Sequence, residues 1–184
     1  MKVEELSLKG LKLLTPLVFK DERGFFFESF SLKNLEDPVL DFPINSWCQE
    51  NHSRSFSRVI RGLHYQSVPG QAKLIRCGNG AIVDVVVDIR PESPTFGKHE
   101  KIFLDSDSQN QLYIPVGFAH GFSTLSYTAD VLYKVDSYYN ATEEKTLQWD
   151  DPDLNIDWEV NDPIVSDRDK SGESFASLKT RLFK

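Results

Sequence analysis

Cysteine, long apolar runs and surplus positive charge are all scarce in this sequence. Its 184 residues include two cysteines, Cys48 and Cys77, too few for a disulfide framework or a four-cysteine metal site. We therefore expect a reducing compartment and predict a cytoplasmic protein. No apolar run approaches the length of a membrane span, and residues 1–10 lack the apolar stretch of a signal peptide, so no membrane partner is expected.

The charge balance argues against another class of partner. The chain carries 21 Lys and Arg residues against 28 Asp and Glu residues, a net charge of −7, which disfavours a nucleic-acid or anionic-membrane surface. A small anionic substrate remains open, because arginines can gather in one pocket. With 40% hydrophobic and 12% aromatic residues, the composition is typical of a globular protein, and residues 1–184 fit one domain.

The sequence does contain a series of short strands separated by turns. We expect strands at 11–19, 24–30, 58–66, 72–77, 81–89, 101–105, 111–116 and 129–139. Two helices are expected, 31–37 and 174–183, the second with apolar residues at helical spacing and Ser174 as a possible N-cap. This pattern predicts an all-β fold, an antiparallel sandwich or barrel that can hold one ligand inside.

Alternation along two strands raises the question of which polar residues point inward. In 81–89 the odd positions are all apolar, whereas the even set includes Asp84. If the odd face packs between the sheets, Asp84 faces the other side, either a barrel lumen or solvent. Trp47, Gln49 and Asn51 share a face, where the amides could grip a polar ligand or could be ordinary strand-edge polarity.

The stretch "RGLHYQ" (61–66) places a cation and an imidazole on opposite faces of a regular strand. His64 is either a satisfied core residue or part of a pocket that it shares with Arg61. The shared pocket requires an irregular backbone, and Gly62 permits one, since glycine within a strand often marks a bulge. We predict a bulge at Gly62 or Leu63.

A metal site is the next possibility for a small β-barrel. Cupin-type metal sites use a His-x-His pair, and here Gln66 stands where the second histidine would be. No two of the four histidines have the spacing of a local ligand pair, so a metal-free site is favoured.

Longer motifs indicate a family. The segment "IPVGFAHGFSTLS" (114–126), together with "RGLHYQ", "QAKLIRC", "DIRPESPTFG" and "LYKVDSYY", resembles the dTDP-4-dehydrorhamnose 3,5-epimerase family of deoxysugar biosynthesis. The resemblance extends from "DERGFFFESF" (21–30) to "SDRD" (166–169). It implies a cupin-type (jelly-roll) antiparallel β-barrel with few helices, a homodimer, no cofactor and no metal. The implied substrate is a dTDP-4-keto-6-deoxy sugar, epimerised at C3 and C5 through enolates on the way to dTDP-L-rhamnose.

The resemblance also implies roles for individual residues. His64 matches the family's base, Asp169 the carboxylate that pairs with it, Tyr133 the proton donor on the opposite face, and Lys73 the cation beside the C4 oxygen. The matches to substrate contacts are Arg23 and Arg61 for the diphosphate and sugar, Glu28, Gln49, Asn51 and His120 for nucleotide and substrate, Tyr139 for stacking on thymine, and Glu144. Some of these contacts would cross the dimer interface through the N-terminal strands, which makes 24–30 an interface strand.

Two departures from the family pattern lie near Asp169. Arg168 stands where the family usually has lysine, and "KSGES" (170–174) replaces a usual proline, which puts the placement of this segment and the Arg168 contact in doubt. Two other functions remain open. A C3-only epimerase or a ketoisomerase is disfavoured by Tyr133, and a non-catalytic nucleotide-sugar binding barrel is disfavoured by the complete set of His64, Lys73, Tyr133 and Asp169.

Overall fold

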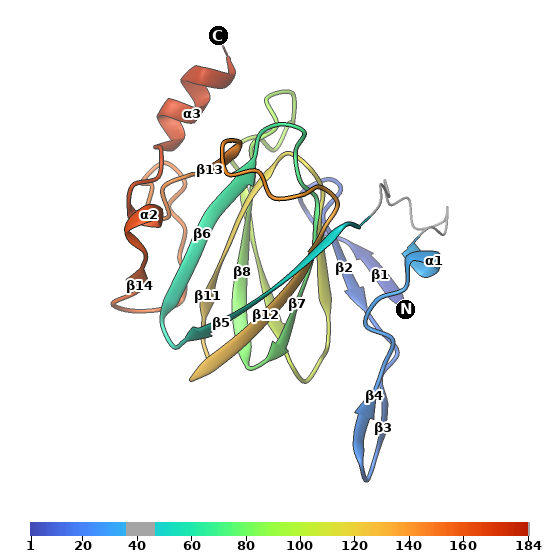
Figure 1. Cartoon of the computed structure of the whole chain (residues 1–184). Coiled ribbons are helices and arrows are strands. Elements are labelled where there is room, and N and C mark those ends of the chain that lie inside the picture. Colours follow the sequence, from blue (N-terminus) through green and yellow to red (C-terminus); the bar gives the residue numbers. More distant parts are fainter. Residues whose placement is uncertain (36–46, 184) are drawn as a thin grey trace.

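Two facing sheets form the body of the protein in a computed structural model that describes residues 1–35 and 47–183 (Figure 1). The first sheet has the order β1 (Lys2–Glu5), β2 (Lys12–Thr15), β10 (Gln111–Ile114), β7 (Lys73–Asn79), β12 (Thr128–Val135) and β5 (Gln49–Phe56). The second has the order β13 (Glu144–Thr146), β6 (Val59–Gln66), β11 (Phe118–Thr124), β8 (Ala81–Asp88) and β9 (His99–Asp105). Strand β14 (Ile164–Val165) runs parallel to β6, and the other pairs are antiparallel.

The remaining elements are small. A separate hairpin, β3 (Phe19–Asp21) and β4 (Gly24–Phe26), projects from the body, and the helices are α1 (Leu32–Leu35), α2 (Asp167–Lys170) and α3 (Phe175–Leu182) (Figure 1). The predicted all-β, cupin-type barrel with few, mainly C-terminal helices is confirmed. None of the described helices is long and apolar enough to cross a membrane.

Several element boundaries differ from the expected ones. Residues 11–19 divide into β2 and β3, because Pro16 cannot donate to a strand ladder, and the strand expected at 24–30 ends at Phe26. No strand is expected from the sequence at 118–124, where β11 forms, because its seven residues are all buried and so show no alternation. The helix at 174–183 forms as α3 with Ser174 as its N-cap. Of the helix expected at 31–37, residues 32–35 form α1 and the end lies outside the described residues.

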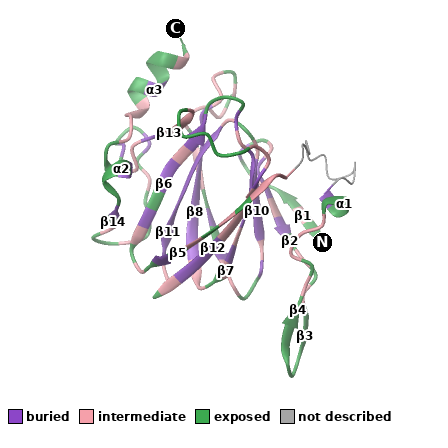
Figure 2. Cartoon of the chain, viewed as in Figure 1, coloured by how far each residue is buried: buried purple, intermediate pink, exposed green. Residues whose placement is uncertain are grey.

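Two apolar clusters explain the alternation along β8. Ile82 and Val86 of the even set pack between the sheets with Ile75, Leu112 and Val131 of the first sheet. The odd set packs on the outer face of the second sheet, under the C-terminal segment and α3. The condition considered for the sequence, that the odd face packs between the sheets, is therefore not met. The odd face is buried because the segment after β12 folds back to cover it. Figure 2 shows this buried interior of the sheets beside the exposed hairpin.

Strand β6 carries the predicted bulge. His64 pairs with His120 of β11 and Arg61 pairs with Phe122, so two residues of β6 stand opposite Gly121 alone. The backbone angle φ of Gly62 is +127°, a conformation that favours glycine. The bulge removes one residue from the alternation, and Arg61 and His64 consequently project from the same face of β6.

Candidate active site

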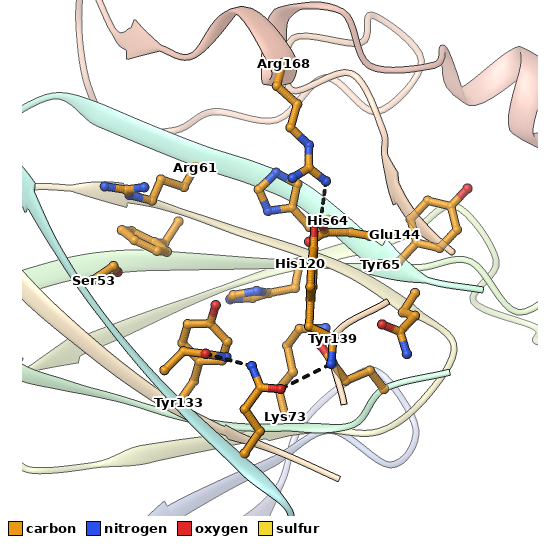
Figure 3. Close-up of a pocket in the computed structure, with 15 residues that line it drawn as sticks. Ser53, Arg61, His64, Tyr65, Lys73, His120, Tyr133, Tyr139, Glu144 and Arg168 are labelled. Carbon is orange, nitrogen blue, oxygen red and sulfur yellow. Dashed lines mark hydrogen bonds and ion pairs between the residues drawn. The ribbon is translucent and has the colours of Figure 1, made fainter. Parts of the chain in front are cut away.

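A cavity of about 460 Å³ opens between the two sheets. Figure 3 shows side chains from β5, β6, β7, β11 and β12, together with residues of the C-terminal segment, lining this one space. The structure brings ten of the thirteen predicted site residues to its wall: Gln49, Asn51, Arg61, His64, Lys73, His120, Tyr133, Tyr139, Glu144 and Arg168. Of the two alternatives left open for Gln49 and Asn51, the structure has both side chains on the cavity wall.

His64 and Asp169 form a hydrogen-bonded pair at the wall. Nε2 of His64 lies 2.6 Å from Oδ1 of Asp169, and the His64 side chain is 28% exposed towards the cavity. Asp169 sits in α2, where the Ser166 hydroxyl caps its backbone N–H, and it is 4% exposed. Burial alone would raise the pKa of Asp169, but the hydrogen bond and charge of His64 hold that pKa below its ordinary value. Asp169 is therefore an ionised partner that fixes the imidazole ring and stabilises its protonated form.

A second imidazole–carboxylate pair faces the same lumen. His120 lies directly opposite His64 in the β6–β11 register, and its Nε2 is 2.8 Å from Oδ2 of Asp84. Asp84 is fully buried, and burial raises its pKa while the charges of His120 and Lys73 act against that increase. The sequence left open whether Asp84 faces a lumen or solvent, and the structure places it on the inner face between the sheets, in contact with the cavity residue His120.

Lys73 and Tyr133 approach the cavity from the first sheet. Lys73 is 6% exposed, and burial lowers the pKa of its ammonium to about 8, an effect that Glu144, Asp136 and Asp84 oppose. The pKa of Tyr133 is raised, first by burial and then by the charge of Glu144, so its hydroxyl keeps its proton at neutral pH. A buried cation and a protonated phenol thus face the His64–Asp169 pair across the lumen.

Contacts between distant segments form the rim of the cavity. Arg168 of α2 donates from Nη2 to Oε2 of Glu144 in β13 at 2.5 Å. The backbone of Glu173 pairs with Thr146 and Gln148 on either side of Leu147, which secures the segment that follows Arg168. The lysine-to-arginine departure therefore leaves a cation at the cavity mouth. Tyr139, which is 53% exposed, lies beside it and donates its backbone N–H to Gln49.

Arg61 is held at the wall by two contacts made possible by the bulge. Its Nε donates to the Ser55 hydroxyl at 2.9 Å, and its Nη2 donates to the carbonyl of Arg54 at 3.3 Å. The guanidinium lines the cavity and is still exposed to solvent. A positioned, accessible guanidinium suits an anionic group such as a phosphate.

Two predicted residues do not reach this cavity. Arg23 lies in the turn of the β3–β4 hairpin, pairs with Asp21 and has a side chain that is 85% exposed. Glu28 follows β4, contacts Asn34 and lines a different cavity near the N-terminal strands. Within one chain, the structure therefore separates these two residues from the other eleven.

Sequence reasoning missed five residues of the lining: Ser53, Tyr65, Gln66, Gln71 and Phe122. Alternation offers a signal for three of them, because Ser53 continues the face of Asn51, Gln66 that of His64, and Phe122 that of His120. Gln71 lies before β7 and had no such signal. Among residues 1–35 and 47–183, no group of three or more His, Cys, Asp or Glu side chains is placed to hold a metal ion.

Comparisons with known proteins agree with the resemblance in the sequence. A family model described as dTDP-4-dehydrorhamnose 3,5-epimerase matches residues 5–177. The dTDP-4-dehydrorhamnose 3,5-epimerase of Shigella flexneri is 44% identical over 179 residues, which cover 95% of this chain and 96% of that protein.

Solved structures give the same result for the fold. The dTDP-6-deoxy-D-glucose-3,5-epimerase of Legionella pneumophila, in complex with dTDP-4-keto-L-rhamnose, matches with a TM-score of 0.93 and 39% identity, over 98% of this chain and 96% of that chain. A 3'-monoepimerase from Streptomyces bikiniensis, in complex with dTDP-quinovose, matches with a TM-score of 0.87 and 35% identity, over 97% and 89% of the two chains.

Proposed function

The chain belongs to the dTDP-4-dehydrorhamnose 3,5-epimerase family, and we propose that the cavity between its sheets is where it inverts C3 and C5 of a dTDP-4-keto-6-deoxy sugar. The observation that carries this proposal is the convergence of four groups on one cavity. A histidine paired with an ionised carboxylate comes from the second sheet and α2, and a buried cation and a phenol come from the first sheet.

The first half of the reaction removes a proton. The C4 ketone acidifies the hydrogens on C3 and C5, because the electron pair of the broken C–H bond moves into an enolate. We assign the proton-accepting role to Nδ1 of His64, since Nε2 is bonded to Asp169. The ammonium of Lys73 stabilises the enolate oxygen more than the ketone oxygen, and this difference lowers the barrier.

The second half returns a proton to the opposite face of the carbon. We assign this donation to the hydroxyl of Tyr133, which keeps its proton at neutral pH. The carbon is thereby inverted, and the charges left on His64 and Tyr133 are cancelled by proton exchange with solvent. The same cycle at the other carbon completes the double epimerisation without a change in oxidation state.

The remaining residues of the lining serve to bind the substrate. Arg61 and Arg168 suit the diphosphate, and the exposed ring of Tyr139 at the mouth suits stacking on thymine. The other proposed contacts to nucleotide or sugar are Gln49, Asn51, His120 and Glu144. We further propose a cytoplasmic location, which fits the two free cysteines.

The Tyr133→Phe variant tests the division of labour between the two halves. We expect the wild-type protein to convert dTDP-4-keto-6-deoxy-D-glucose into a product inverted at both carbons, identified by NMR. In Tyr133→Phe the ring is kept and only the hydroxyl is lost, so exchange of substrate protons with solvent continues in part while product formation falls by ~10²-fold or more. A variant that forms product at the wild-type rate would assign the acid to another group.

A C3-only epimerase is the second candidate, because the chain also matches the 3'-monoepimerase of Streptomyces bikiniensis. Both activities need a base, an acid and a cation at the ketone. The outcome depends on whether C5 is also brought between His64 and Tyr133, and product stereochemistry distinguishes the two.

We propose that the chain works as a homodimer in which the β3–β4 hairpin enters the partner's cavity. The hairpin carries three exposed aromatic rings, Phe19, Phe25 and Phe26, which are 58%, 57% and 71% exposed. A two-stranded hairpin is marginally stable alone, and an exposed apolar surface of this kind is typical of an interface. Its projection from the body supports delivery of Arg23 to a second subunit (Figure 1).

Complementation tests this assembly. We expect a dimer by sedimentation velocity, and Arg23→Ala should raise KM about tenfold to hundredfold, because a charge-assisted bond to phosphate is lost. Lys20→Ala, in the same hairpin, is the matched control and should leave KM close to wild type. Mixing the Arg23→Ala and His64→Ala proteins should restore activity at low substrate concentration. In the mixed dimer, one cavity keeps its own His64 and receives a hairpin with an intact Arg23 from the other subunit. A monomeric protein, or no recovery on mixing, contradicts the proposal.

A further inference from the structure

Asp84 is a buried carboxylate next to the cavity that the proposed mechanism leaves unused. It lies on the same face of β8 as Ile82 and Val86, which pack between the sheets, and it is 0% exposed. Its Oδ2 accepts from His120, whereas its Oδ1 has no hydrogen-bond partner among the described residues. A buried carboxylate oxygen without a hydrogen bond is costly unless an opposite charge compensates for it.

The compensating charge comes from the opposite sheet. Lys73 of β7 is 6% exposed, and the negative groups that act on its ammonium do so through space. The charges of Asp84 and Lys73 act on each other: each favours the ionised form of the other. The other charged or titratable groups around the Lys73 ammonium are Glu144 of β13, Asp136 after β12, and the cavity side chains His64, His120 and Tyr133.

We infer that Asp84 is a positioning residue for the reaction, which orients the ring of His120 and adds to the negative charge that keeps Lys73 cationic inside the cavity. The bond from Nε2 of His120 directs the other ring nitrogen away from Asp84. Burial outweighs the surrounding negative charges and leaves the pKa of Lys73 at about 8, so without Asp84 the lysine loses its proton at lower pH. This inference rests on the proposed role of Lys73 at the enolate oxygen.

The Asp84→Asn variant removes the charge and keeps the shape and a hydrogen-bond acceptor for His120. We expect the titration midpoint of Lys73, followed by NMR of ¹³Cε-labelled lysine and assigned with Lys73→Arg, to fall below the wild-type value. The pH at which kcat/KM begins to fall on the alkaline side should move down with it, so the variant should lose more activity at pH 8 than at pH 6.5. The matched control is Asp88→Asn, on the same strand and face and equally buried but bonded to Arg90, which should leave the Lys73 midpoint unchanged.

The wild-type protein provides a second measurement that does not depend on how the variant folds. The ¹³Cγ resonance of Asp84 should show an ionised carboxylate at pH 7 and should respond to the titration of Lys73. A protonated Asp84 at pH 7, or an unmoved Lys73 midpoint in folded Asp84→Asn, overturns the inference. Absence of epimerase activity in the wild type, with both NMR results as expected, would instead overturn the proposed function.

Discussion

Replacement of His64 with alanine is expected to lower kcat by ~10²–10⁴-fold, the usual cost of removing a general base. The substitution leaves the backbone of β6 in place, and His64 is only partly buried, so the variant should fold and bind dTDP close to normally. Asp169→Asn should also be damaging, because the imidazolium loses its negative partner. Steady-state kinetics on the 4-keto sugar nucleotide, with calorimetric dTDP binding as the check on folding, measures both effects.

His52→Ala is the matched control for His64→Ala. His52 lies on β5 with a side chain that is 55% exposed, contacts Asp130 and does not line the cavity. Its removal should leave kcat within about twofold of the wild-type value. A His64→Ala protein with a near-normal rate would refute the assignment of the base and, with it, the role given to Asp169.

The Gly62→Val variant is expected to lose the bulge, and the protein should be markedly less stable. A Cβ at Gly62 would stand 2.5 Å from the Cα of Gly121 and 2.9 Å from the carbonyl oxygen of His120, both backbone atoms of β11. A branched side chain also cannot adopt φ = +127° without strain. Backbone strain and overpacking each cost roughly 1–3 kcal/mol, so we expect the free energy of unfolding to fall by about 3 kcal/mol or more.

Gly24→Val separates the two contributions. Gly24 has nearly the same backbone angle, φ = +125°, but nothing lies within 4 Å of the position that its Cβ would occupy. This variant therefore incurs the backbone cost without the clash, and urea unfolding should show a clearly smaller loss of stability. Equal losses for the two variants would mean that the close approach of β6 and β11 does not matter.

The bulge shows how far the alternation of residues along a strand can predict the site. Arg61 and His64 have opposite parity in the sequence, and only an irregularity at Gly62 or Leu63 could place both in one pocket. The register between β6 and β11 has that irregularity. The chemical roles could not be predicted in this way, because parity says which side chains share a face and not what reaction they perform. Those roles came from the family resemblance.

Other features depended on long-range packing that local patterns do not record. The outer face of β8 is covered by the segment after β12, and a continuous apolar set looks the same whether it packs against a sheet or against such a segment. The His120–Asp84 pair likewise joins β11, which the sequence analysis did not predict, to β8. Arg23 and Glu28 lie away from the cavity of their own chain, and no local pattern in the sequence indicates this separation.

The most direct test of the central claim is a count of solvent deuterium in the product. The purified wild-type protein is incubated in D₂O with dTDP-4-keto-6-deoxy-D-glucose, without added metal or nicotinamide, and C3 and C5 are examined by NMR and mass spectrometry. Removal and return of a proton at each carbon predicts deuterium at both positions, unaffected by a chelator. Deuterium at C3 alone would contradict double epimerisation, loss of activity with the chelator would contradict a metal-free site, and deuterium at neither carbon would contradict the proton-transfer mechanism itself.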